Sequence, residues 1–179
     1  MEIHYVTSNV TKFEEAQHIL VDEHHKGHFT FIHSPIHLTE IQGTTEEIAF
    51  HKVKEAYSIL KKPVIIDDIS VSFPCLNGLP GPYIRTFLEV LREDGIWDLI
   101  SRYNDHQCCC LCTIAFFQDD MHAARLFEGK TSGTCVPPRG TLRHGTHSWN
   151  SIVQPDGHDR TFAEMTLKEV STISPRNKA

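Results

Sequence analysis

Short apolar runs alternate with longer amphipathic stretches along most of this chain, and this alternation restricts the available folds more than any other feature. Each apolar run has the length of a strand, and each amphipathic stretch repeats its apolar residues at helical spacing. We expect strands at 3–6, 29–32 and 64–66, and helices at 12–20, 44–60 and 86–100. Such alternation predicts an α/β fold.

Two later segments change the prediction from a purely parallel sheet to a mixed one. Residues 110–117 and 123–128 are strand-like and are separated by the turn formers of 118–120, which is typical of a β-hairpin. The glycines of 129–133 suggest a turn toward another strand. A hairpin beside alternating strands and helices indicates a mixed β-sheet.

The amino-acid composition favours some classes of protein over others. The 179 residues are 40% hydrophobic, which suits one domain, with two lobes possible. The formal net charge of −6 opposes a nucleic-acid partner. Since no run of 18 apolar residues exists, we expect no membrane span. Four of the six cysteines crowd into residues 108–112, which favours a reduced, cytoplasmic protein over a disulfide framework.

A candidate phosphate site lies between the first strand and the first helix. Thr7, Ser8 and Asn9 are turn and cap formers, and Lys12 follows them in the first helical turn. Backbone N–H groups at a helix start attract phosphate, and a lysine adds a full positive charge. Taken alone, an ordinary helix cap with a solvated lysine explains the same residues and is the more common case.

A candidate metal site starts from two adjacent acids. Asp67 and Asp68 end the apolar run at 64–66, where a bound cation would offset their repulsion. Glu46 and Glu47, at the first turn of the preceding helix, offer a further carboxylate. Oxygen ligands of this kind suit Mg²⁺. The alternative is a solvated turn and a helix that favours acids at its start.

Two loops carry further candidates. Residues 77–83 are dense in glycine and proline, which sets a particular loop path, with a rigid connector as the plain alternative. Trp149 lies in a loop-rich stretch from 137 to 159, and an aromatic face can stack on a base. The alternative for Trp149 is a packed loop.

Together, these segments resemble the inosine triphosphate pyrophosphatase (HAM1-like) family, in the same order and over nearly the whole chain. The Gly-Leu-Pro-Gly-Pro-Tyr run at 78–83 and the Thr-Phe-Ala-Glu-Met run at 161–165 are the most specific matches. The matching segments are 7–12, 42–52, 67–68, 77–88, 127–133, 138–140 and 154–165.

The resemblance implies one HAM1-like domain over residues 1–179. Its α/β fold would have an elongated mixed β-sheet with flanking helices and two lobes around a central nucleotide cleft. The implied reaction hydrolyses non-standard purine nucleoside triphosphates, such as ITP, dITP and XTP, to the monophosphate and pyrophosphate. The implied cofactor is Mg²⁺, with Mn²⁺ as an alternative, and the implied assembly is a cytoplasmic homodimer that binds neither nucleic acid nor membrane.

The resemblance also implies roles for particular residues. Glu47 and Asp68 would hold the metal, and Asp68 would activate the attacking water. Lys52 would neutralise phosphate charge in both binding and catalysis. The residues implied to bind substrate are Thr7, Asn9, Lys12, Lys52, Trp149, Asn150 and Arg176.

Departures from the family pattern gather toward the C-terminus. The loop at 141–151 is longer than usual, Asn150 replaces an aspartate, and Val170 replaces a lysine. Pro175 replaces a histidine, Ile69 replaces a hydroxyl residue, and the chain is shorter than usual. Loss of a cationic contact weakens binding, and loss of a base-reading histidine weakens discrimination. The alternative function is therefore a nucleotide-binding or dimer-forming pseudoenzyme of the same fold.

Overall fold

The computed structural model describes residues 1–20, 29–142 and 148–179. Part of the altered loop at 141–151 therefore lies outside the described residues. The chain divides into two compact units. The first contains Met1–Asp68, Cys112–Gly129 and Arg176–Ala179, and the second contains Ile69–Leu111 and Lys130–Pro175. The strands β3, β5 and β6 each contribute residues to both units.

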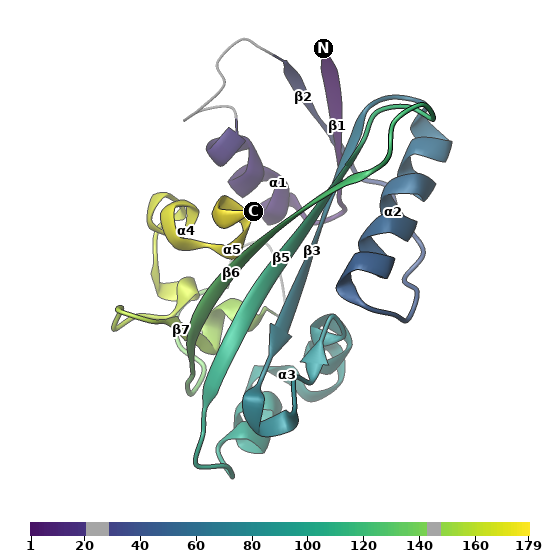
Figure 1. Ribbon diagram of the computed structural model, residues 1–179. Coiled ribbons are helices and arrows are strands. Elements are labelled where there is room, and N and C mark those ends of the chain that lie inside the picture. The colour runs from purple at the N-terminus through teal and green to yellow at the C-terminus, as the bar shows by residue number, and fades with distance from the viewer. Residues whose placement is uncertain (21–28, 143–147) are drawn as a thin grey trace. The chain divides into compact units, whose positions relative to one another are not determined.

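The elements alternate as the sequence predicts over the first half of the chain (Figure 1). In order they are β1 (Glu2–Val6), α1 (Val10–Gln17), β2 (Thr30–Ser34), α2 (Thr45–Leu60), β3 (Val64–Ser72), η2 (Pro74–Leu76), β4 (Pro80–Gly81), α3 (Ile84–Ile100), β5 (Gln107–Phe117), β6 (Arg125–Cys135), η3 (Trp149–Ser151), β7 (Val153–Pro155), η4 (Phe162–Glu164), α4 (Leu167–Ile173) and α5 (Pro175–Lys178).

The strands form a mixed sheet, which confirms the predicted fold class. Their order is β2-β1-β3-β5-β6-β7, with β4 paired to β3. The pairs β1–β2 and β1–β3 are parallel, whereas β3–β4 and β6–β7 are antiparallel. The parallel pairs follow from the crossover helices between these strands, because parallel neighbours require a long connection.

In the first unit, α1 and α2 cover opposite faces of the sheet (Figure 1). Successive residues of a strand point to opposite faces, so β1 serves both helices. Val6 joins the core cluster that contains Ala49 and Val53 of α2. Tyr5, its neighbour, lies in ring contact with Phe13 of α1, with 6.1 Å between ring centroids.

The predicted helix at 44–60 is confirmed, and its start has a clear local cause. Thr44 accepts a hydrogen bond from the Glu47 backbone N–H, while the Glu47 carboxylate accepts one from the Thr44 backbone N–H. This capping box pairs N–H groups that the helix itself leaves unpaired. The helix ends at Leu60, and its C-cap Lys61 adopts a left-handed conformation two residues before Pro63.

Two predicted strand boundaries were wrong. The strand expected at 64–66 continues through both acids to Ser72, because Ile69 and Val71 extend its buried pattern. The predicted turn at 129–133 lies inside β6, where every second residue is buried as far as Cys135. Burial on one face of a strand outweighs the local turn preference of glycine and aspartate.

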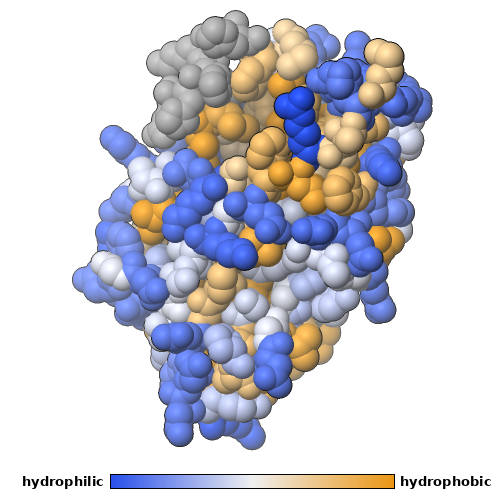
Figure 2. Space-filling view, viewed as in Figure 1, coloured by the Kyte–Doolittle hydropathy of each residue, from blue (hydrophilic) through white to orange (hydrophobic). Residues whose placement is uncertain are grey.

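The six cysteines, all within the described residues, form no disulfides. All six cysteines are free thiols, and burial raises the pKa of Cys110 well above its ordinary value. Within the described ranges, no helix is long and apolar enough to cross a bilayer. Figure 2 shows hydrophilic and hydrophobic residues interspersed over the face that it draws.

In the second unit, Gly140 joins two motifs that are distant in sequence. It has a φ of +85°, and a Cβ built on it would lie 2.7 Å from the backbone carbon of Ala163. Beside it, the Thr161 hydroxyl donates a hydrogen bond of 3.1 Å to the Arg139 carbonyl. The Pro-Arg-Gly motif therefore packs directly against the Thr-Phe-Ala-Glu-Met motif, with close contact between their backbones.

We predict that Gly140→Ala destabilises the protein more than Gly157→Ala. Gly157 has a similar φ of +81° but has nothing within 4 Å of the added Cβ, so it isolates the cost of the backbone conformation. That cost is about 1–2 kcal/mol, and the clash at Gly140 adds about 1–3 kcal/mol. Urea denaturation followed by tryptophan fluorescence measures both free energies of unfolding. Equal losses would contradict the close packing at Gly140.

Candidate functional site

The predicted phosphate loop lies between β1 and α1, at the carboxyl end of a parallel strand. Asn9 is the N-cap of α1, and its side chain accepts a hydrogen bond of 3.3 Å from the Lys12 backbone N–H. The Thr7 hydroxyl accepts a hydrogen bond of 3.1 Å from the Asn9 backbone N–H. These two contacts give the loop a defined turn at the positive end of the helix dipole, where anions are stabilised.

Lys12 extends from this loop to the acids of β3. Its Nζ donates a hydrogen bond of 3.2 Å to the Asp67 carbonyl and lies 3.7 Å from the Asp67 carboxylate. The structure therefore brings together residues that the sequence separates by 55 positions. Since the Lys12 side chain keeps part of its surface exposed, its charge stays accessible to a ligand.

Asp67 is the buried member of the acid pair and belongs to an ionic network. The Arg176 guanidinium donates to its carboxylate from Nε at 3.0 Å and from Nη2 at 2.6 Å. Arg176 also pairs with Glu15 of α1, and both partners are buried. Burial alone would raise the pKa of Asp67, but the charges of Arg176 and Lys12 hold this pKa well below its ordinary value.

This network perturbs its uncharged neighbours. Burial and the nearby Asp67 carboxylate raise the pKa of Tyr5 well above its ordinary value. The same two causes raise the pKa of Cys112 to about 12. Both groups therefore stay neutral at physiological pH, so the charge of Asp67 is balanced by Arg176 and Lys12.

Asp68, the next residue of β3, is the accessible acid and pairs with α2. Its Oδ2 accepts a hydrogen bond of 2.8 Å from Lys52 Nζ, and its side chain is 25% exposed. Lys52 also contacts Glu40 at 2.5 Å. Burial alone would lower the pKa of Lys52, but the two carboxylates raise it, so Lys52 stays charged.

The carboxylates predicted to hold a metal are Glu47 and Asp68. Glu47 lies in the first turn of α2, where its Oε2 accepts the hydrogen bond from Thr44. Across residues 1–20, 29–142 and 148–179, no three His, Cys, Asp or Glu side chains form a group that could hold a metal ion. Two carboxylates still suit Mg²⁺, which commonly takes one or two of them together with water and substrate phosphates.

Trp149 and Asn150 belong to the second unit. They form the short helix η3, whose N-cap Ser148 accepts a hydrogen bond from the Asn150 backbone N–H at 3.3 Å. The edge of the Trp149 ring contacts Phe162, with 5.3 Å between centroids and 80° between planes. This contact supports the packing interpretation of Trp149, and its stacking on a base stays a prediction.

Val170 and Pro175, the two C-terminal residues that depart from the family pattern, lie in different local environments. Val170 is buried in α4, so the position that carries a lysine in the family pattern is part of the apolar interior here. Pro175 starts α5, and Arg176 follows it as the buried partner of Asp67. Arg176 thus forms ion pairs with both Asp67 and Glu15. Its role in substrate binding stays a prediction.

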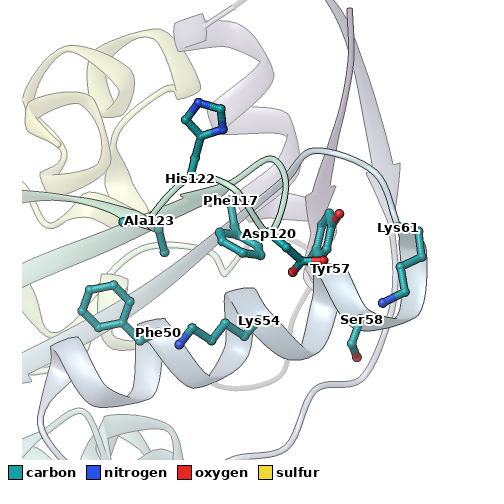
Figure 3. Close-up of a pocket in the computed structure, with 10 residues that line it drawn as sticks. Phe50, Lys54, Tyr57, Ser58, Lys61, Phe117, Asp120, His122 and Ala123 are labelled. Atoms are coloured by element: carbon teal, nitrogen blue, oxygen red, sulfur yellow. The ribbon is translucent and has the colours of Figure 1, made fainter.

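A cavity of about 580 Å³ in the first unit contains none of the predicted site residues (Figure 3). Phe50, Lys54 and Tyr57 of α2 line it, together with Phe117, Asp120 and residues 122–124. With 3.6 residues per turn, Lys52 points to roughly the opposite side of α2. The cavity is therefore separate from the cluster around Asp68.

The comparisons with known proteins place this mixed α/β chain in a family. A model described as the Ham1 family matches residues 3–179, so the chain belongs to the Ham1 family. The inosine triphosphate pyrophosphatase of Batrachochytrium dendrobatidis is 40% identical over 175 residues, which cover 98% of this chain and 88% of that protein. The inosine triphosphate pyrophosphatase of Yarrowia lipolytica is 38% identical, with 100% and 92% covered.

Among solved structures, a HAM1 protein from Coxiella burnetii has a TM-score of 0.82 and 23% sequence identity. The match covers 99% of this chain and 93% of that one. At this identity the likeness supports the fold, and it agrees with the mixed sheet and flanking helices described above.

Sequence reasoning missed two partners in this site, Glu15 and Glu40. In the sequence, Glu15 has the pattern of an ordinary acidic residue on a helix. It is buried next to Arg176 because the C-terminal segment packs against α1. Glu40 lies in an irregular segment before α2, where sequence periodicity carries no signal. The apolar run before Asp67 was the available clue that one acid of the pair is buried.

We predict that Asp67→Asn destabilises the protein by about 3–5 kcal/mol, because it removes one partner from a buried ion pair and leaves Arg176 under-compensated. The free energy of unfolding from urea titrations, near neutral pH, measures this loss. Asp159→Asn is the matched control, since the Asp159 side chain is 97% exposed. A loss no larger than that of the control would contradict the role of Asp67.

The same network predicts a pH dependence. Because the folded pKa of Asp67 is lowered, its stabilisation is present above the unfolded value of about 3.9 and is lost as the pH falls toward the folded pKa. Below about pH 4, wild-type stability should therefore fall more steeply than that of Asp67→Asn, by up to about 1.4 kcal/mol per pH unit. If the free energies of unfolding of the wild type and Asp67→Asn fell with the same slope against pH, the lowered pKa of Asp67 would be contradicted.

Proposed function

We propose that this chain is a nucleoside triphosphate pyrophosphatase that hydrolyses inosine triphosphate to the monophosphate and pyrophosphate. The observation that carries this proposal is the ion pair of Lys52 with Asp68, the strand residue that follows the Asp67 reached by Lys12. Lysines and an accessible carboxylate around a helix start are suited to a polyphosphate and its metal. Membership of the Ham1 family and the names of relatives that are 38–40% identical support the same reaction.

The chemistry requires stabilisation of negative charge that develops on the phosphates. Lys12 and Lys52 would fill that role, and the hydrogen bond to the Asp67 carbonyl orients Lys12. Thr7 and Asn9 would contact the phosphates from the helix start. Glu47 and Asp68 would hold Mg²⁺, which supplies Lewis-acid activation of a phosphoryl oxygen and of water when it is bound.

Asp68 is the residue proposed to accept the proton of the attacking water. Its partial exposure leaves one side of the carboxylate reachable, and Lys52 contacts its Oδ2 at 2.8 Å. Water attacks the α-phosphorus, the bond to the bridging oxygen breaks, and pyrophosphate leaves with that oxygen. The nucleoside monophosphate is the second product.

The substrate preference, the metal, the assembly and the location of the enzyme are part of the same proposal. We expect ITP, dITP and XTP to be the preferred substrates, with Trp149, Asn150 and Arg176 among the residues that bind them. Since Val170 supplies no charge, substrate binding should be weakened, and since Pro175 supplies no side-chain hydrogen bond, discrimination between bases should be relaxed. Mg²⁺ or Mn²⁺ as the metal, a homodimer and a cytoplasmic location complete the proposal. The relatives' names favour turnover over the pseudoenzyme alternative.

We predict that Asp68→Asn lowers Mg²⁺-dependent release of pyrophosphate from ITP by about 10²–10⁴-fold, the range expected for loss of a general base. The asparagine keeps the shape of the side chain but removes its charge. Coupled detection of pyrophosphate with ITP, XTP, ATP and GTP measures both rate and base preference.

Asp159→Asn is again the control and should keep wild-type rates, because its side chain is 97% exposed and it is none of the residues proposed to bind substrate or metal. A folded wild-type protein that releases no pyrophosphate from any of the four nucleotides would overturn the proposed function. Circular dichroism of each variant separates loss of folding from loss of activity.

A further inference from the structure

We infer that His33 is a positioning residue for phosphate binding, which aims the backbone N–H of Ser8 by holding the Thr7 carbonyl. The inference rests on the proposed function and adds a residue outside the motifs that carry the family resemblance. His33 lies in β2, a strand that contributes none of the predicted site residues.

The contact itself is short and has one possible direction. His33 Nε2 lies 2.8 Å from the Thr7 carbonyl oxygen. A carbonyl oxygen only accepts hydrogen bonds, so Nε2 must carry a proton and donate it. The neutral ring is therefore held as the Nε2–H tautomer.

β2 holds Thr7 from both sides of the residue. The Thr7 backbone N–H donates a hydrogen bond of 3.2 Å to the Ser34 carbonyl, and the His33 ring holds the Thr7 carbonyl. Ser34 is itself fixed, because its hydroxyl lies 2.8 Å from His4 Nδ1 in β1. The His33 side chain thus adds one hydrogen bond to the loop, next to the last backbone hydrogen bond between Thr7 and β2.

The ring of His33 is held in place by stacking. It lies against the Phe13 ring with 4.6 Å between centroids and 18° between planes. Phe13 stacks in turn on Phe31 of β2, at 5.4 Å and 12°. Since Phe13 follows Lys12 in α1, one imidazole connects the end of β2, the phosphate loop and the first turn of the helix.

The consequence for the loop follows from peptide geometry. The Thr7 carbonyl and the Ser8 N–H belong to one planar trans peptide and point in opposite directions. A hydrogen bond that fixes the carbonyl therefore fixes the direction of the Ser8 N–H as well. This N–H belongs to the loop between β1 and the N-cap Asn9, where phosphate is favoured.

Two substitutions separate the donor from the ring. His33→Phe keeps an aromatic ring against Phe13 and removes the donor, whereas His33→Gln keeps an N–H donor near the Nε2 position. His37→Phe is the matched control, because His37 is an exposed histidine four residues further along. Thermal unfolding verifies that each variant is folded.

We expect His33→Phe to raise KM for ITP about three- to tenfold, the effect of one hydrogen bond, with kcat nearly unchanged. His33→Gln should recover most of this loss, and His37→Phe should show none. Calorimetric titration with Mg²⁺ and inorganic pyrophosphate should give a matching rise in Kd for His33→Phe. An unchanged KM and Kd, or an equal effect of Phe and Gln, would overturn the inference.

The proposed function and this inference fail separately. Absence of turnover in the wild type would overturn the function, while the pyrophosphate titration would still test His33. If His33→Phe does not fold, ¹⁵N chemical shifts of the wild-type histidines decide the matter. The Nε2–H tautomer at His33 would support the inference, and the Nδ1–H tautomer would overturn it.

Discussion

The buried ion pair between Asp67 and Arg176 is the constraint on which the site depends. A carboxylate without solvent contact is tolerated only when its charge is compensated, and Arg176 and Lys12 provide that compensation. Because successive strand residues face opposite ways, burial of Asp67 leaves Asp68 on the accessible side of β3. One acid of the pair therefore serves the fold, and the other is available for chemistry.

Two lysines of the first unit contact these two positions of β3. Lys12 reaches Asp67 from the start of α1, and Lys52 reaches Asp68 from the middle of α2. The two lysines thus approach from helices on opposite faces of the sheet. Each of these lysines is held by a carboxylate of opposite charge.

Local signals in the sequence predicted the helices and the loop well and the strand limits poorly. The capping residues around Thr44 and the apolar spacing through Leu60 were sufficient for α2. The limit placed after Ile66 was wrong because two acids look like a strand end, whereas a distant arginine makes one of them a core residue. His33 and Glu40 were missed for a similar reason, since their partners lie in other elements.

The sequence by itself determined the alternation of strands and helices, a cap-forming segment at residues 7–9, and the set of lysines and acids that are candidates for polyphosphate chemistry. These depend on periodicity and on residue type, which are local properties. Only the tertiary structure decided which acid of the pair is buried, because that choice depends on Arg176, 109 residues further along the chain. A compensating charge acts through space, and its position exists only once the chain has folded.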